Sequence, residues 1–136
     1  MSVSGAEARH QIANLLHTYV AIADKKDVNA VVALLGNSHV EFPVAQSSDP
    51  AGARLLFSRL WRAPEGHRHD VSNLVVNPGP EDGQWLASAH YTRWVLGGDA
   101  PCVHTLGQYE LLINGRDWSF LYLKVAQVWT AGMSKV

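Results

Sequence analysis

Residues 84–129 read QWLASAHYTRWVLGGDAPCVHTLGQYELLINGRDWSFLYLKVAQVW, and this stretch decides the expected fold. Residues 84–96 alternate between apolar and polar side chains, the pattern of a strand with one face in a core. Residues 103–113 and 118–129 complete a series of strands. Gly97-Gly98-Asp99 is a turn signal and Asn114-Gly115 a strong hairpin signal. Strands joined by such short turns pair antiparallel, because a parallel pair needs a long crossover.

Upstream of this stretch, residues 69–76 predict one more strand, closed by the turn Asn77-Pro78-Gly79-Pro80. Residues 39–44 predict a short strand that stops near Pro43. The remaining segments before residue 67 have the character of helices. The predicted sheet is therefore built mainly from the second half of the chain.

Three helices are expected before the long strands. Ser4-Gly5-Ala6-Glu7 fits a capping box that begins the first helix. Asp27 can cap a second helix, which Gly36 is well placed to end. Asp49-Pro50 is a helix-start signature for a third, which runs to Trp61. The apolar face of the first helix falls at helical spacing and consists of Ile12, Leu15, Leu16, Tyr19 and Ala23.

The element order predicts an α+β fold in which N-terminal helices cover one face of a curved, mixed but largely antiparallel sheet. A strongly curved sheet wrapped around a helix leaves an interior cavity, where small ligands bind. The 136 residues suit one domain, expected over residues 1–136. The expected ligand is a small, mostly apolar organic molecule.

Composition narrows the possible partners. Lys and Arg number 11 against 12 Asp and Glu, and Lys25-Lys26 is the only adjacent basic pair, so no nucleic-acid partner is expected. No apolar stretch approaches the length of a membrane span. The N-terminus lacks a signal-peptide pattern, and the single cysteine, Cys102, excludes an internal disulfide. A cytoplasmic location is therefore expected.

Several short motifs together resemble the SnoaL-like family of the nuclear-transport-factor-2-like superfamily. The first helix ends in Tyr19-Val-Ala-Ile-Ala-Asp24, and His69-Asp-Val-Ser-Asn73 is similar to the His-x-x-x-Asn strand of that family. Gly107-x-Tyr109-Glu110 followed by Gly115-x-x-Trp118-x-Phe120 resembles its last hairpin. The resemblance covers nearly the whole chain in element order. It implies an α+β cone that encloses a pocket.

The resemblance also implies a type of chemistry. Relatives include polyketide cyclases, scytalone dehydratase and ketosteroid isomerase, which suggests a cofactor-independent lyase, isomerase or cyclase for a polyketide-, terpenoid- or steroid-like substrate. Carried over by position, Asp24 would orient His69, and His69 would be the general base. Tyr19 or His104 would donate a hydrogen bond to a developing oxyanion. No cofactor and no metal are expected.

Other interpretations of the same residues remain open. Asp24 lies on the flank of the apolar stripe of its helix, where it could also be a solvated residue near the helix end. His67-x-His69 aims two rings at one face of a strand, and His90 or His104 could add a third nitrogen for a metal. The fold alone would equally suit a non-catalytic binding or assembly module.

Residues expected to shape the pocket are scattered and mostly apolar: Asn73, Phe42, Leu56, Leu60, Trp61 and Leu106. A dehydrochlorinase is a further relative that the resemblance implies. The last predicted strand contains no arginine, in contrast to that enzyme, so the sequence does not support stabilisation of a leaving chloride. The outer sheet face in such cones is commonly apolar, and Trp85, Trp94 and Trp129 could lie there. A homodimer or other homo-oligomer is therefore expected.

Overall fold

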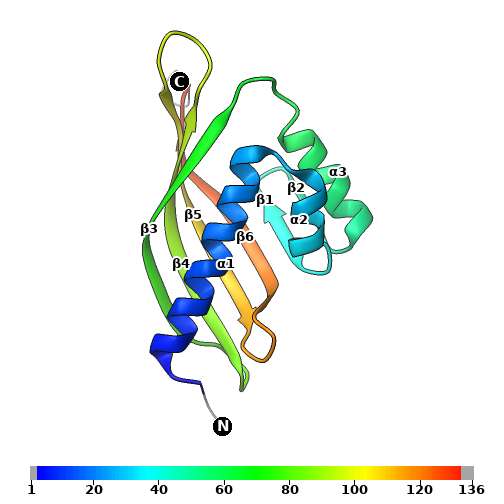
Figure 1. Cartoon of the computed structure of the whole chain (residues 1–136), viewed down its shortest axis with the longest axis vertical. Coiled ribbons are helices and arrows are strands. Elements are labelled where there is room, and N and C mark those ends of the chain that lie inside the picture. The colour runs from blue at the N-terminus through cyan, green and yellow to red at the C-terminus, as the bar shows by residue number, and fades with distance from the viewer. Residues whose placement is uncertain (1–2, 133–136) are drawn as a thin grey trace.

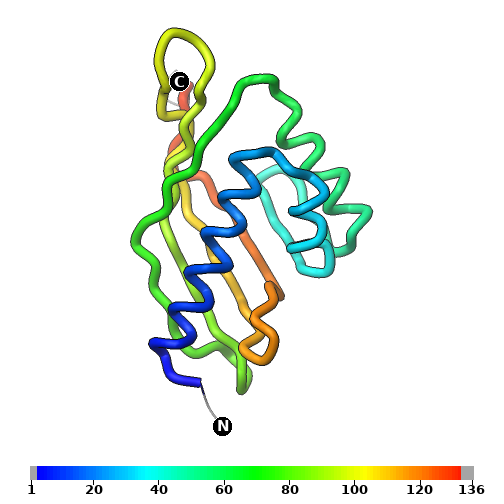
Figure 2. Tube along the Cα trace, in the orientation of Figure 1, coloured from blue at the N-terminus to red at the C-terminus, as the bar shows by residue number. Residues whose placement is uncertain are grey.

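The computed structural model describes residues 3–132, in which three helices pack against a curved sheet of six strands (Figures 1 and 2). The elements follow one another as α1 (Gly5–Lys25), α2 (Val28–Leu35), β1 (His39–Phe42), β2 (Ala45–Ser47), α3 (Pro50–Leu60), β3 (His67–Pro78), β4 (Gln84–Val95), β5 (Cys102–Asn114) and β6 (Ser119–Thr130). In Figure 1, α1 crosses the sheet, while α2 and α3 lie together beside it. The predicted α+β class is confirmed.

The sheet is open and mixed, with the strand order β2-β1-β6-β5-β4-β3. The four long strands pair antiparallel in chain order, as their short turns predict. The single parallel pairing among the described strands joins β1 to β6, with Val40 opposite Leu123. This pairing brings the N-terminal half of the chain onto the free edge of β6.

Side chains cap the three helices at the predicted residues. Ser4 Oγ accepts the backbone N–H of Glu7 at 3.1 Å, which is one half of the predicted capping box. The carboxylates of Asp27 and Asp49 accept backbone N–H groups at the starts of α2 and α3, at 3.0 and 2.7 Å. Each bond satisfies an amide that has no partner within its own helix.

Two local features differ from the expectation. Residues 45–47 form β2, which pairs antiparallel with β1 across Pro43 and Val44. A strand of three residues is too short for alternation to be recognised in the sequence. The hairpin at Asn114-Gly115 is present, but its loop covers residues 115–118 rather than two residues.

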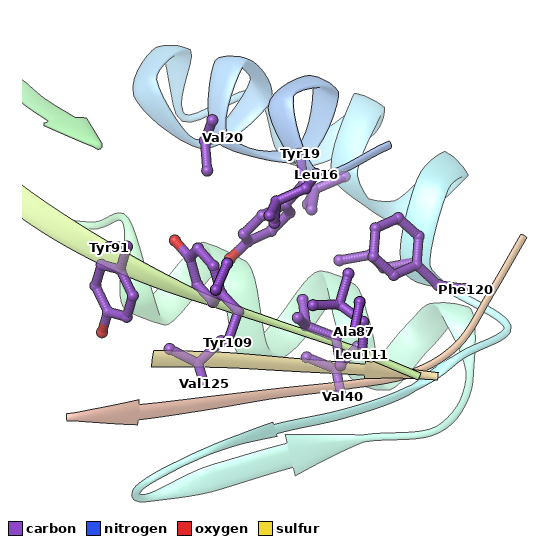
Figure 3. Close-up of a cluster of buried hydrophobic side chains, with 14 of the residues drawn as sticks. Leu16, Tyr19, Val20, Val40, Ala87, Tyr91, Tyr109, Leu111, Phe120 and Val125 are labelled. Carbon is purple, nitrogen blue, oxygen red and sulfur yellow. The ribbon is translucent and has the colours of Figure 1, made fainter. Parts of the chain in front are cut away.

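The core lies between α1 and the inner face of the sheet. Leu16 and Tyr19 of α1 point toward Tyr109 and Leu111 of β5, and Figure 3 shows these side chains together. Ala87 and Ala89 of β4 occupy the same layer.

A β-bulge in β3 reverses the direction of one predicted site residue. Ser72 pairs with His90 and Val75 with Ser88, so β3 carries one extra residue here. Asn73 occupies the bulge with a φ of 57°. It is exposed, whereas Leu74 packs against the core. The prediction that Asn73 helps to shape the pocket is wrong, because the bulge shifts the alternation by one residue and turns Asn73 away from the face of His69.

Replacing Asn73 tests this backbone conformation. Asn73→Val is expected to lower the free energy of unfolding by about 1–2 kcal/mol, since a β-branched residue is strained in the left-handed region. Asn73→Gly should be nearly neutral, because glycine adopts a positive φ freely. Urea denaturation measures both changes. Asn77→Val on the same strand is the matched control, and equal losses at the two positions would contradict the assignment.

Candidate active site

A hydrogen-bonded contact between Asp24 and His69 joins the end of α1 to the start of β3. Asp24 Oδ1 accepts the ring Nδ1–H and the backbone N–H of His69, each at 2.8 Å. The side chain of His69 is 8% exposed and that of Asp24 29%. The predicted contact is therefore present, and the two bonds fix both the backbone and the ring of His69.

This contact determines which ring nitrogen of His69 is available for chemistry. Because a carboxylate can only accept, Nδ1 carries the proton in the neutral ring and Nε2 keeps its lone pair. Burial lowers the pKa of His69 below its usual value, and the hydrogen bond that His69 donates to Asp24 opposes that shift. His69 is therefore neutral at pH 7 and able to accept a proton at Nε2.

Asp24→Asn is expected to lower the pKa of His69 further. The substitution removes the hydrogen bond and charge that favour the imidazolium, while the burial that disfavours it stays. An NMR titration of the His69 ring measures the shift. Asp70→Asn is the matched control: Asp70 has a weaker influence of the same sign, so its removal should lower the pKa less. An unchanged or raised pKa in Asp24→Asn would contradict the assigned contact.

His69 lines a cavity of about 160 Å³ between α1, α3 and the sheet. The apolar part of the wall includes three residues that the sequence predicts there, namely Phe42, Leu60 and Trp61. The polar part combines histidines, tyrosines and one arginine. The full lining is Tyr19, Phe42, Leu60, Trp61, His67, His69, Tyr91, Arg93, Thr105, Tyr109, Val125 and Gln127.

Three tyrosines form an aromatic wall beside His69. The rings of Tyr91 and Tyr109 stack with centroids 4.5 Å apart, and Tyr19 meets Tyr109 edge to face at 5.8 Å, as Figure 3 shows. Burial raises the pKa of Tyr91 to about 12 and also raises the pKa values of Tyr19 and Tyr109. All three hydroxyls therefore stay protonated near neutral pH and can donate hydrogen bonds.

Gly107 creates the space for this stack. A Cβ at Gly107 would lie 2.2 Å from the ring of Tyr91 and 2.5 Å from the carbonyl oxygen of Ala126. Tyr91 pairs with Gly107 across β4 and β5, so its ring lies over the glycine. The glycine in the family-like motif Gly107-x-Tyr109 thus positions one tyrosine of the cavity and precedes another.

A second histidine, His67, is held by hydrogen bonds at both ring nitrogens. Its Nε2–H donates to the carbonyl oxygen of Ala23 at 2.5 Å, and its Nδ1 accepts from Arg93 Nε at 3.0 Å. His67 is 4% exposed, and burial lowers its pKa to about 4. With both nitrogens occupied, His67 supports the site and has no free nitrogen for proton transfer.

His104 contacts Arg93 instead of His69. Arg93 Nη1 lies 3.0 Å from His104 Nδ1, which also lies 2.8 Å from Thr105 Oγ1. A bulge in β5 places His104 and Thr105 together opposite Arg93. The predicted role of His104 as a donor to the oxyanion is not supported, because His104 does not line the cavity and its contacts run through Arg93 to His67.

Two of the predicted pocket residues lie elsewhere. Leu106 is 43% exposed on the outer face of β5, where its neighbours Thr105 and Gly107 point inward. Leu56 is buried in the core but does not line the cavity around His69. Both predictions are wrong, because each relied only on the apolar character of the residue. Whether a residue lines the pocket also depends on which face of its helix or strand it occupies.

Sequence reasoning gave too little weight to Tyr91, Arg93 and Tyr109. The alternation of β4 carries the signal, because Ala87, Ala89 and Tyr91 share the buried face and Arg93 continues it.

Residues 3–132 contain no group of three or more His, Cys, Asp or Glu side chains that could hold a metal ion. Within the same range, no helix is long and apolar enough to span a bilayer.

Solved structures with this fold come from several bacterial proteins. A candidate aromatic ring hydroxylase from Novosphingobium aromaticivorans aligns with a TM-score of 0.77 and 18% identity, over 93% of each chain. A candidate scytalone dehydratase from the same organism gives 0.76 and 14% identity, over 93% of this chain and 87% of that one. ActVI-ORFA from Streptomyces coelicolor gives 0.77 and 14% identity, over 88% and 96%.

At these identities the likeness to solved structures shows a shared fold. No curated protein matches the sequence. The family model of the SnoaL-like domain matches residues 4–130, nearly the whole chain. The protein therefore belongs to the SnoaL-like domain family, with the nuclear-transport-factor-2-like α+β fold that its motifs predict.

Proposed function

We propose that this protein is a cofactor-independent lyase, isomerase or cyclase in which His69 removes a proton from a small, largely apolar organic substrate. The observation that carries the proposal is the 2.8 Å contact between Asp24 and His69, whose ring lines the cavity. A hydrogen-bonded carboxylate fixes the tautomer and leaves Nε2 as the base. Membership of the SnoaL-like family supports the same class of chemistry.

The first step transfers a proton from substrate carbon or oxygen to His69 Nε2, and the ring becomes an imidazolium beside the Asp24 carboxylate. When the proton comes from carbon next to a carbonyl, the C–H electron pair moves onto the carbonyl oxygen as an enolate. The hydroxyl of Tyr19, which lines the cavity, can donate a hydrogen bond to that oxygen. The enolate is neutralised when the imidazolium returns its proton.

Three outcomes follow from this common intermediate. Return of the proton to a different carbon gives an isomer. Loss of a β-hydroxyl group, protonated by the His69 imidazolium and released as water, gives a dehydrated product. Attack of the enolate carbon on a carbonyl of the same molecule closes a ring and leaves an alkoxide, which takes the proton from the His69 imidazolium. None of these routes changes the oxidation level of the substrate as a whole, so none needs a redox cofactor.

Proton exchange with solvent tests the proposal even while the substrate is unidentified. The protein is incubated in D2O with small cyclic and aromatic ketones, hydroxyketones and alcohols, and NMR follows deuterium incorporation and new products. We expect exchange or conversion of at least one compound, faster as the pH rises through the pKa of His69. Saturable binding without exchange or product would instead indicate a non-catalytic binding module.

A homodimer is a further part of the proposal. Val75, Leu86 and Leu106 are 52%, 45% and 43% exposed, and their side chains lie on the outer face of the sheet. Of the three tryptophans expected on that face, Trp85 instead packs against the core on the inner face of β4, and Trp94 and Trp129 are partly buried. Light scattering should give twice the chain mass, and a monomer at high concentration would exclude this assembly.

A cytoplasmic location is also part of the proposal, and cell fractionation would check it.

A further inference from the structure

Arg93 places a guanidinium in the cavity directly beside the proposed base. It lies on the inner face of β4, where it pairs with His69 of β3 across the sheet. Side chains paired in this way lie about 5 Å apart at their Cβ atoms. Arg93 and His69 both line the cavity. A group bound to Arg93 would therefore be close to the atom that His69 deprotonates.

Within the part of the chain that the structure describes, the positive charge of Arg93 has no negative partner. Its two hydrogen bonds go to Nδ1 of His67 and Nδ1 of His104. Burial lowers the pKa of both histidines, so both rings are neutral at pH 7. Between residues 3 and 132, no Asp or Glu carboxylate lies within ion-pair distance of Arg93. A partly buried charge without a partner is costly, so a role for it must be sought.

No other residue in the cavity wall carries a permanent charge. The remaining lining residues are aromatic, aliphatic or neutral polar, and Asp24 lies behind His69, outside the wall. A guanidinium has five N–H groups. The two contacts with His67 and His104 use only two of them, on Nε and Nη1. The N–H groups that remain match the two oxygens of a carboxylate.

We infer that the substrate of this cavity is a carboxylic acid whose carboxylate binds Arg93 while its ring packs against the apolar and aromatic side chains of the cavity. This inference rests on the proposed function, since it names the substrate class of the same site. Phe42, Trp61 and Tyr109 provide the apolar and aromatic surface for the ring. The pairing of Arg93 with His69 then sets the reacting atom within a few bonds of the carboxylate.

Matched acids and amides test this inference by binding alone. Benzoate and benzamide, 2-naphthoate and 2-naphthamide, and cyclohexanecarboxylate and its amide differ in charge but hardly in shape. Isothermal titration at pH 7 measures the affinity of each. Because hydrogen bonds to charged groups are the stronger kind, we expect at least one acid to bind about 10- to 100-fold more tightly than its amide.

Variants then assign the preference to Arg93. Arg93→Gln should bind acid and amide equally, while Arg93→Lys should keep part of the preference because it keeps the charge. Arg68→Gln, on the exposed outer face of β3, is the matched control and should behave as the wild type. Circular dichroism and the thermal midpoint establish that each variant is folded, and the wild-type comparison stands even if Arg93→Gln does not fold.

Several results would overturn the inference. These are equal binding of every acid and its amide to the wild type, failure of all three acids to bind, and a preference that survives in Arg93→Gln. Loss of turnover alone in Arg93→Gln, without a preference for acids, would mean that Arg93 acts only on developing charge. His69→Asn separates the two proposals: it should slow turnover by about 10²- to 10⁴-fold and still bind the acid more tightly than the amide. A preference for acids in a protein without turnover would leave this inference standing and reject the catalytic one.

Discussion

His69→Asn is expected to reduce kcat/KM by about 10²- to 10⁴-fold for whichever substrate the exchange assay identifies, the usual contribution of a general base. Asparagine has no lone pair that titrates near neutral pH. Its amide N–H can still donate to Asp24, and the backbone N–H of residue 69 keeps its own bond to the same carboxylate oxygen. The local structure should therefore survive while the proton acceptor is lost.

The kinetic parameters distinguish loss of a base from loss of binding. Most of the effect should fall on kcat, because His69 acts on the reacting proton, while KM should change little. Measurements above and below the pKa of His69 should show that the variant has lost the rise in rate with pH. The variant that should change nothing is His90→Asn, since His90 is exposed on β4. A folded His69→Asn variant with rates within a few-fold of the wild type would reject His69 as the base.

The sequence predicted the helices and long strands well because local chemistry determines them. Ser4, Asp27 and Asp49 cap the helices where a side-chain acceptor precedes an apolar face. The alternation of residues 84–96 corresponds to β4 almost residue for residue. In the helices the stabilising bonds are made within a few residues of sequence. In β4 the alternation of side chains reveals the strand, although its backbone hydrogen bonds go to the neighbouring strands β3 and β5.

The positions of the site side chains depended on features that arise only when strands pair. The bulge at Asn73 turns that residue outward, and the bulge beside Thr105 turns His104 toward Arg93. A bulge is one extra residue relative to the neighbouring strand, so one strand read by itself does not reveal it. The contact between Asp24 and His69 could be predicted from the family resemblance, whereas helical periodicity alone left Asp24 on the flank of α1.

We expect the protein to lose stability in mild acid, independently of any substrate, because of the buried histidine His67. Burial lowers its pKa from 6.5 to about 4 in the folded protein. Between these two values the unfolded chain binds a proton at His67 and the folded chain does not. The free energy of unfolding should therefore fall as the pH drops through this window, by about 3 kcal/mol for this group.

His67→Gln should flatten that dependence, because glutamine has no titrating group in this range and its amide N–H can still donate to the carbonyl oxygen of Ala23. Urea denaturation of wild type and variant from pH 7 to pH 4 measures the difference. The exposed His10→Gln, on α1, is the matched control and should retain the wild-type slope. Since protonated His67 would also repel the neighbouring Arg93 guanidinium, loss of stability should coincide with loss of the Arg93 geometry. If His67→Gln kept the full acid sensitivity, the assignment of a neutral, doubly hydrogen-bonded His67 would be wrong. The loss of stability in acid would then come from His69 or His104, whose pKa values are also lowered.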